Sequence, residues 1–126
     1  MSADDSLQLA ERLFGAITSG NVEAVKQIYA PDAVIWHNND GLEQSADSNL
    51  RVLAWVVANV RNLRYEEVRR QRTDGGFMQQ HVLRGTAPNG REVNIPACII
   101  CTVQHGRITR LDEYLDSAHL APVLET

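Results

Sequence analysis

The sequence predicts one α+β domain spanning residues 1–126, in which three N-terminal helices pack on a strongly curved, mostly antiparallel sheet. Apolar residues recur at helical spacing in the first half of the chain and alternate in the second half. Two turn signals, Asn89-Gly90 and His105-Gly106, connect the last three alternating segments as hairpins. A sheet that curves around its helices makes a cone, so we expect an internal apolar pocket.

The helices are indicated by apolar residues three and four positions apart. Gly20 ends the first helix, Asn21 caps the second, and Ser45 and Asp47 begin the third. Asp116 caps a final short turn. The apolar faces consist of Leu7, Leu9, Ala10, Leu13, Phe14 and Ile17, then Val22, Ala24, Val25 and Ile28, then Leu50, Leu53, Ala54, Val57 and Val60.

Strands are predicted over residues 33–37, 63–73, 77–86 and 92–103 and in the segment that ends at Leu115. If Asn89-Gly90 is a two-residue type I′ turn, Gln80, Val82 and Arg84 share the interior face with Ile95, Ala97 and Ile99. In this register His81 points outward. Both faces of the 92–103 strand are apolar, so both should be covered, one by the helices and the other by a second copy of the chain.

The turn at His105-Gly106 allows two registers, and they place Glu113 on opposite faces. We favour a three-residue loop with Gly106 in the left-handed conformation, because His105 then needs no positive φ. Glu113 then joins Leu111 and Leu115 on the interior face.

Glu113 is the main candidate for chemistry, because a carboxylate among apolar side chains is costly unless it is paired or used. An apolar pocket is expected to raise its pKa and to make it a general acid or base near neutral pH. His37 and Arg84 are candidate catalytic partners. An ion pair between Arg84 and Glu113 without a catalytic role fits the pattern as well. The predicted substrate-binding residues are Ile35, Gln80, Val82, Ile95, Ala97, Ile99 and Leu111.

The chain carries 12 Lys and Arg against 16 Asp and Glu, a net charge of −4, which gives no electrostatic case for nucleic acid binding. Cys98 and Cys101 lie three apart on a strand and so point to opposite faces, which argues against a disulfide or a shared metal. The N-terminal segment lacks a signal-peptide pattern, and no apolar run could span a bilayer. We therefore expect a cytoplasmic protein with no membrane partner.

The segments Ala30–His37, His81–Gly90 and His105–Leu120 resemble the NTF2-like superfamily, specifically its SnoaL-like branch. This resemblance implies a cone-shaped barrel, a homodimer, and an apolar cavity open at one end. Polyketide cyclases, limonene epoxide hydrolases, ketosteroid isomerases and dehydratases of this group use acid/base chemistry without a cofactor or metal. Glu113, before Tyr114-Leu115-Asp116, looks like the acidic residue that epoxide hydrolases carry in the last strand. The positions similar to their middle-strand Arg and Asp hold Val82 and Arg84, so their Asp-Arg-Asp arrangement is not reproduced.

Two functions follow as expectations. The first is a cofactor-independent enzyme of the cyclase, isomerase, lyase (dehydratase) or hydrolase type that acts on a small, largely apolar, oxygen-bearing molecule. The second is a homodimeric domain that binds a small molecule, or serves as an accessory subunit, without chemistry. A domain that binds another protein through its outer sheet is a third interpretation.

Overall fold

A computed structural model describes residues 3–124 of the chain. Its helices are α1 (Ala3–Thr18), α2 (Val22–Ile28), α3 (Ala46–Asn59) and α4 (Ala121–Leu124), the last preceded by a 3₁₀ turn, η1 (Ser117–Leu120). Its strands are β1 (Tyr29–His37), β2 (Glu43–Ser45), β3 (Arg61–Thr73), β4 (Gly76–Thr86), β5 (Glu92–Gln104) and β6 (Arg107–Leu115).

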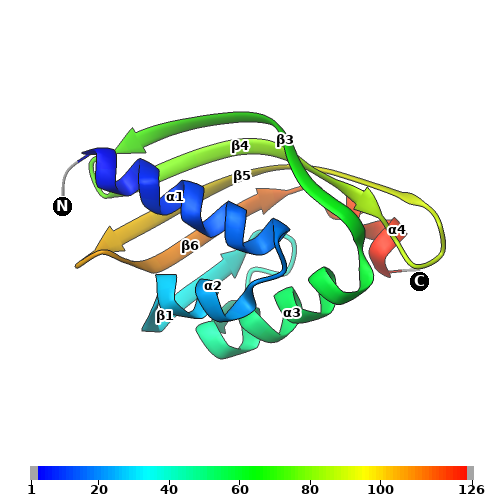
Figure 1. The fold of residues 1–126 in the computed structure, drawn as a ribbon, viewed down its shortest axis with the longest axis horizontal. Coiled ribbons are helices and arrows are strands. Elements are labelled where there is room, and N and C mark those ends of the chain that lie inside the picture. The colour runs from blue at the N-terminus through cyan, green and yellow to red at the C-terminus, as the bar shows by residue number, and fades with distance from the viewer. Residues whose placement is uncertain (1–2, 125–126) are drawn as a thin grey trace.

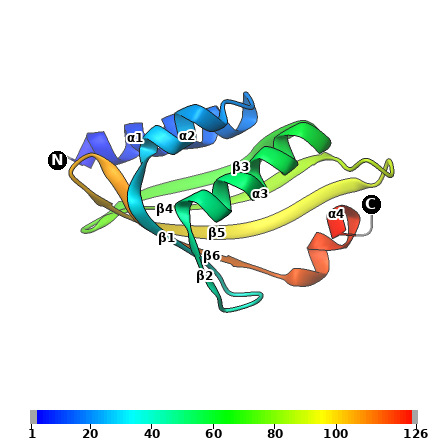
Figure 2. The same cartoon turned by 90° about the horizontal axis from the view of Figure 1, so that it is seen from below.

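The strands form one curved sheet in the order β2-β1-β6-β5-β4-β3, in which only β1 and β6 run parallel. Helices α1, α2 and α3 lie together on one side of this sheet, and η1 and α4 cross its end (Figure 1, Figure 2). The predicted α+β architecture is confirmed. The sheet is open, because β2 and β3 are its two edges and do not pair with each other.

The predicted caps at Asn21, Ser45 and Asp116 are confirmed. The side chain of Asn21 accepts a hydrogen bond from the Ala24 amide at 3.1 Å, and the Ser45 hydroxyl accepts one from the Ser48 amide at 3.1 Å. Asp116 caps η1 in the same way. The edge strand β2 was not expected, because its three residues follow a polar loop and show no alternating pattern.

The turn between β4 and β5 differs from the prediction. Ala87 donates its N–H to Arg91 O at 2.9 Å, and Gly90, with φ +85°, donates to Ala87 O at 2.9 Å. This is a three-residue loop, a type I turn closed by a left-handed glycine. A two-residue turn would need a hydrogen bond from the N–H of Pro88, which proline lacks.

The longer loop moves the pairing of β4 by one residue, so the predicted register is wrong. Leu83 opposes Ile95, His81 opposes Ala97, and Gln79 opposes Ile99. Because strand side chains alternate, the whole set changes face. Gln79, His81 and Leu83 point to the interior, and Gln80, Val82 and Arg84 point to the outer face.

The turn between β5 and β6 also differs from the prediction, but here the predicted face of Glu113 is kept. His105 and Gly106 have φ of 52° and 77°, and Gln104 pairs with Arg107, so this is a two-residue turn. Val103 then pairs with Ile108 while Thr102 pairs with Arg110, which leaves Thr109 as an extra residue in β6. This bulge restores the predicted pairing: Ile99 opposes Glu113, and the interior position of Glu113 is confirmed.

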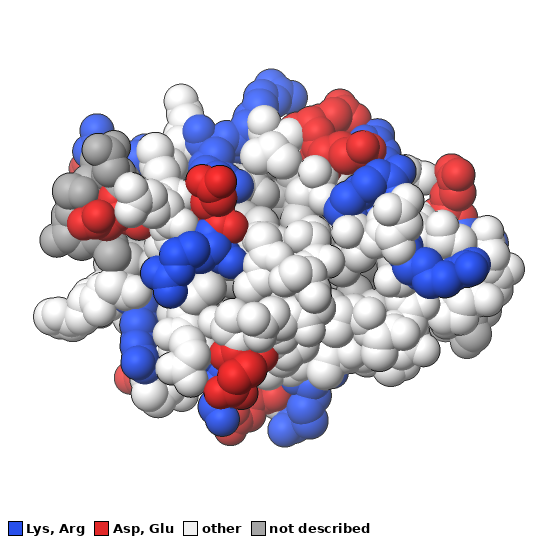
Figure 3. Space-filling view, in the orientation of Figure 1, with Lys and Arg blue, Asp and Glu red and all other residues white. Residues whose placement is uncertain are grey.

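The core lies between α1, α2 and the concave face of the sheet, where Phe77, Leu13 and Ile35 have no exposed surface. No helix within residues 3–124 is long and apolar enough to cross a lipid bilayer. On the face that Figure 3 shows, acidic and basic side chains are interspersed around a largely uncharged middle, without a basic stripe.

Candidate active-site pocket

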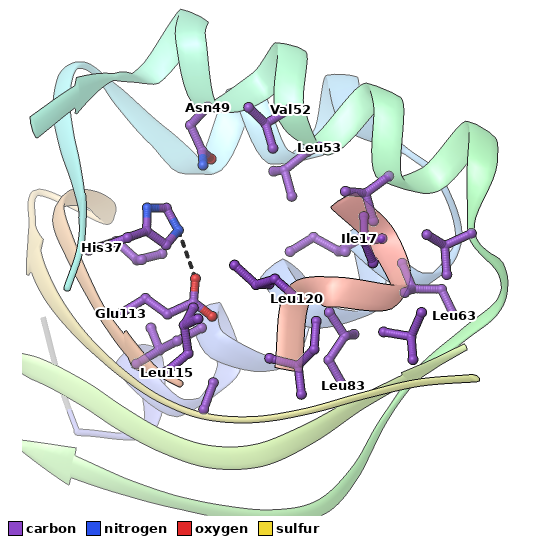
Figure 4. A pocket seen from close by; sticks show the side chains of 18 of the residues that line it. Ile17, His37, Asn49, Val52, Leu53, Leu63, Leu83, Glu113, Leu115 and Leu120 are labelled. Carbon is purple, nitrogen blue, oxygen red and sulfur yellow. Dashed lines mark ion pairs between the residues drawn. The ribbon is translucent and has the colours of Figure 1, made fainter. Parts of the chain in front are cut away.

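A cavity of about 550 Å³ lies between α1, α3 and the concave face of the sheet, within the size range of small-molecule sites (Figure 4). Its wall is mostly aliphatic, with leucine, valine and isoleucine side chains from the helices, from β3 to β6 and from the C-terminal segment. Exposed lining residues mark its mouth: Asn39 and Asp40 on the β1–β2 loop, Val52 and Trp55 on α3, and Leu124 on α4.

His37 and Glu113 meet at one end of this cavity. The parallel pairing of β1 with β6 puts the two residues side by side, and His37 Nε2 lies 2.8 Å from Glu113 Oε1. Figure 4 shows both side chains directed into the pocket, opposite the aliphatic end where Leu63 and Leu83 lie. The two side chains are 21% and 20% exposed, so the pair is partly shielded from water and open to a ligand.

The hydrogen bond that His37 donates to Glu113 raises the pKa of His37, and the negative charges of Glu113 and Asp40 act in the same direction. Burial lowers this pKa but is outweighed. The pair therefore favours an imidazolium beside a carboxylate, in which His37 orients the Glu113 carboxylate.

We expect this pair to make stability depend on pH. Because the pKa of His37 is higher in the folded protein, its contribution is complete below the unfolded value, about 6.5, and is lost as pH rises through the folded pKa. Glu113→Gln should lower the His37 pKa, measured by NMR of the imidazole protons, and should remove this part of the pH dependence in urea unfolding. An unchanged His37 titration in the variant would contradict the pairing.

Several predicted substrate-binding residues line the cavity: Ile95, Ala97, Ile99 and Leu111. Ile35 lies on the same face but is fully buried in the core beneath the pocket. Gln80, Val82 and Arg84 do not line it, because the corrected register turns them to the outer face.

Arg84 does not contact Glu113, so neither the predicted ion pair nor a direct catalytic contact is present. Its guanidinium lies 2.9 Å from Glu66 Oε1 and 2.9 Å from Glu67 Oε2, and it also donates to Asn94 Oδ1 at 3.1 Å. The hydrogen bonds that Arg84 donates to Glu67 and Glu66 raise the pKa of Arg84. Arg84 is therefore part of a charged network on the outer face.

The interior positions of β4 are instead occupied by Gln79 and His81, which form a buried network with Arg70 of β3. Arg70 Nε donates to Gln79 Oε1 at 2.7 Å, and Gln79 Nε2 lies 2.9 Å from His81 Nδ1. Burial lowers the pKa of His81, which favours the neutral ring as the acceptor of this bond. The outward orientation predicted for His81 is wrong. None of these three residues lines the cavity, but the His81 ring lies 4.6 Å from the ring of Tyr65, which does.

Four polar residues of the pocket were not identified from the sequence: Tyr29, Gln44, Asn49 and Tyr65. Tyr29 begins β1 and donates a hydrogen bond to Asn49 Oδ1 of α3 at 2.8 Å. Tyr65 lines the wall from β3. Burial, and secondarily the charge of Glu113, raises the pKa of Tyr65. The sequence did contain one signal, since Asn49 lies three and four positions before Val52 and Leu53 on one helix face.

Gln44 of β2 also lines the pocket, and its Oε1 atom is buried without a donor among the described residues. A buried acceptor left unpaired costs about 1–3 kcal/mol. We expect Gln44→Met, which removes this acceptor at similar volume, to raise the free energy of unfolding by about 1–3 kcal/mol in urea denaturation. Equal stability of the two proteins would mean that the oxygen is satisfied in solution.

No group of three or more His, Cys, Asp or Glu side chains within residues 3–124 is arranged to hold a metal ion. The two cysteines are free; Cys101 is buried and Cys98 is partly exposed. The acid/base groups that reach the cavity come from His37, Glu113, Asp40 and the two tyrosines.

These features define an α+β fold in which helices pack on an open, curved sheet and enclose an apolar cavity with one polar end. The chain belongs to the SnoaL-like domain family, whose model matches residues 10–111. No curated protein matches the sequence.

Solved structures share the fold over nearly the whole chain. A proposed polyketide cyclase from Xanthomonas campestris pv. campestris superposes with a TM-score of 0.80 at 17% identity, covering 92% of this chain and 93% of that one. A hypothetical protein with a ketosteroid isomerase-like fold from Catenulispora acidiphila, in complex with trimethylamine, superposes with a TM-score of 0.77 at 17% identity, with 90% of each chain covered. An NTF2-like protein from Burkholderia xenovorans superposes with a TM-score of 0.77 at 17% identity, with 96% of each chain covered. The NTF2-like fold expected from the sequence is confirmed.

Proposed function

We propose that this protein is a cofactor-independent acid/base enzyme of the cyclase or isomerase type, acting on a small, largely apolar, oxygen-bearing molecule. The observation that carries the proposal is the Glu113 carboxylate, 2.8 Å from His37, at one end of an otherwise aliphatic cavity of about 550 Å³. The similarity to a proposed polyketide cyclase supports the same class of reaction.

In this proposal Glu113 is the general base. It removes a proton from carbon or oxygen of the bound molecule and returns it elsewhere, which is the step shared by isomerisation, aldol-type cyclisation and dehydration. His37 holds the carboxylate in place and stabilises its charge. The aliphatic wall excludes water from the reacting groups, which strengthens their electrostatic interactions.

The test is proton exchange at carbon, because it does not require the natural substrate. With 1-tetralone, a bicyclic ketone, in D₂O, the wild-type protein should accelerate loss of the C2 proton signal in NMR spectra. Exchange at the buffer rate, with 1-tetralone shown to bind in the same sample, would overturn the enzyme proposal. That result would favour the second candidate, a binding module, for which the apolar wall of the cavity already provides affinity.

We also propose that the protein is a homodimer formed through the outer face of the sheet. Ile100 and Tyr114 are 40% and 47% exposed there, and the Trp36 ring packs against Tyr114 at 5.3 Å, so the apolar surface extends across three strands. We expect Ile100→Lys to convert a dimer into a monomer in light scattering. Leu42→Lys makes the same kind of change at an exposed apolar residue of the β1–β2 loop, and this variant should keep the molecular mass of a dimer. A wild-type monomer would contradict this proposal.

A further inference from the structure

Asn49 interrupts the apolar face that α3 presents to the cavity. It lines the pocket together with Val52, Leu53 and Val56, and it is only 6% exposed. In Figure 4 its amide extends from α3 into the end of the cavity where His37 and Glu113 lie. A buried amide at this position is costly unless its polar atoms are hydrogen-bonded, so its partners indicate its role.

Tyr29 satisfies one side of this amide. Its hydroxyl donates to Asn49 Oδ1 at 2.8 Å, and Tyr29 is itself 4% exposed. Burial is the main cause that raises the pKa of Tyr29, with smaller effects from Cys101 and Glu113. The hydroxyl therefore stays protonated and remains the donor. In this arrangement the hydroxyl proton of Tyr29 points to the amide oxygen of Asn49, and the amide N–H groups point away from the hydroxyl.

The other side of the amide is available to a ligand. No described residue accepts a hydrogen bond from Asn49 Nδ2. The polar end of the cavity therefore combines a fixed neutral donor on α3 with a carboxylate on β6, and the aliphatic remainder holds an apolar body.

We propose that Asn49 binds the carbonyl oxygen of the substrate through its amide N–H, so that the substrate is an apolar ketone, aldehyde or ester. This inference rests on the proposed function in placing the substrate in this cavity. When Glu113 takes the proton from the carbon next to the carbonyl, the C–H electron pair forms a C=C bond and the carbonyl π pair moves to oxygen. Asn49 donates to the enolate oxygen that results, and Tyr29 is the positioning residue.

The test is a binding preference, which does not depend on turnover. We would compare the dissociation constants of 2-acetylnaphthalene, which carries a carbonyl, and 2-ethylnaphthalene, which has the same shape without it. Wild-type protein should prefer the ketone by about 5- to 10-fold, the value of one neutral hydrogen bond. Asn49→Leu should remove this preference and leave the affinity for 2-ethylnaphthalene nearly unchanged.

The matched control is Asn59→Leu, which removes an amide from the same helix at a residue that does not line the pocket and should keep the preference. If Asn49→Leu does not fold because the Tyr29 hydroxyl is left buried and unpaired, the double variant Tyr29→Phe/Asn49→Leu replaces both partners with apolar groups. Tyr29→Phe alone should reduce the preference, since the amide can then rotate.

Three results would overturn the inference: no preference in the wild type, a preference retained without Asn49, or a preference lost in Asn59→Leu. These results are distinct from failure of the proposed function. A carbonyl preference that depends on Asn49, without exchange of the 1-tetralone protons, would keep the binding subsite and remove only the chemistry.

Discussion

Glu113→Gln is expected to lower the rate of carbon-proton exchange by about 10²- to 10⁴-fold, the usual contribution of a positioned general base. The amide keeps the size of the side chain and can still hydrogen-bond to His37, but it cannot accept a proton from substrate. Above the folded pKa of His37, where the pair no longer contributes to stability, the free energy of unfolding should change little. Exchange rates and circular dichroism of the two proteins measure the two effects separately.

Asp112→Asn is the matched control for this variant. Asp112 precedes Glu113 on β6, points to the outer face and accepts a hydrogen bond from Arg110 Nε at 2.9 Å. Its substitution makes the same chemical change one residue away, so we expect exchange at the wild-type rate. Full activity in Glu113→Gln, or an equal loss in both variants, would remove Glu113 as the base.

The interior position of Glu113 could be predicted from sequence because two differences between the predicted and the observed backbone cancelled each other. The β5–β6 turn is one residue shorter than expected, and the Thr109 bulge adds one residue back. The apolar neighbours Leu111 and Leu115 required that face to be buried, and the bulge is the backbone adjustment that satisfies them. Hydrophobic alternation was therefore a better guide to the face of Glu113 than the type of turn.

On β4 the pattern was ambiguous, and the turn decided the register. Residues 79–84 alternate weakly, since each face would receive one aliphatic residue, Val82 or Leu83, together with polar ones. The missing N–H of Pro88 was the signal that could have excluded the two-residue turn. Tyr29 and Asn49 belong to a different case, because they are 20 residues apart and their contact follows only from how α3 packs over β1.

Gln79→Leu is expected to lower the free energy of unfolding by about 3–5 kcal/mol, the sum of two losses in a buried network. It removes the hydrogen bond that the charged Arg70 donates at 2.7 Å. It also leaves His81 Nδ1 without its partner at a site where His81 is 3% exposed. The added volume cannot be relieved by solvent, because Gln79 has no exposed surface. Urea unfolding at constant pH measures the change.

Gln80→Leu is the control, and together the two variants test the register itself. Gln80 is exposed on the outer face, so the same substitution there should change stability by less than about 0.5 kcal/mol. The register with a two-residue Asn89-Gly90 turn would require the reverse order, because Gln80 would then be the buried residue. A larger loss for Gln80→Leu than for Gln79→Leu would therefore return Arg84 to the interior face and would change the set of residues that face the pocket.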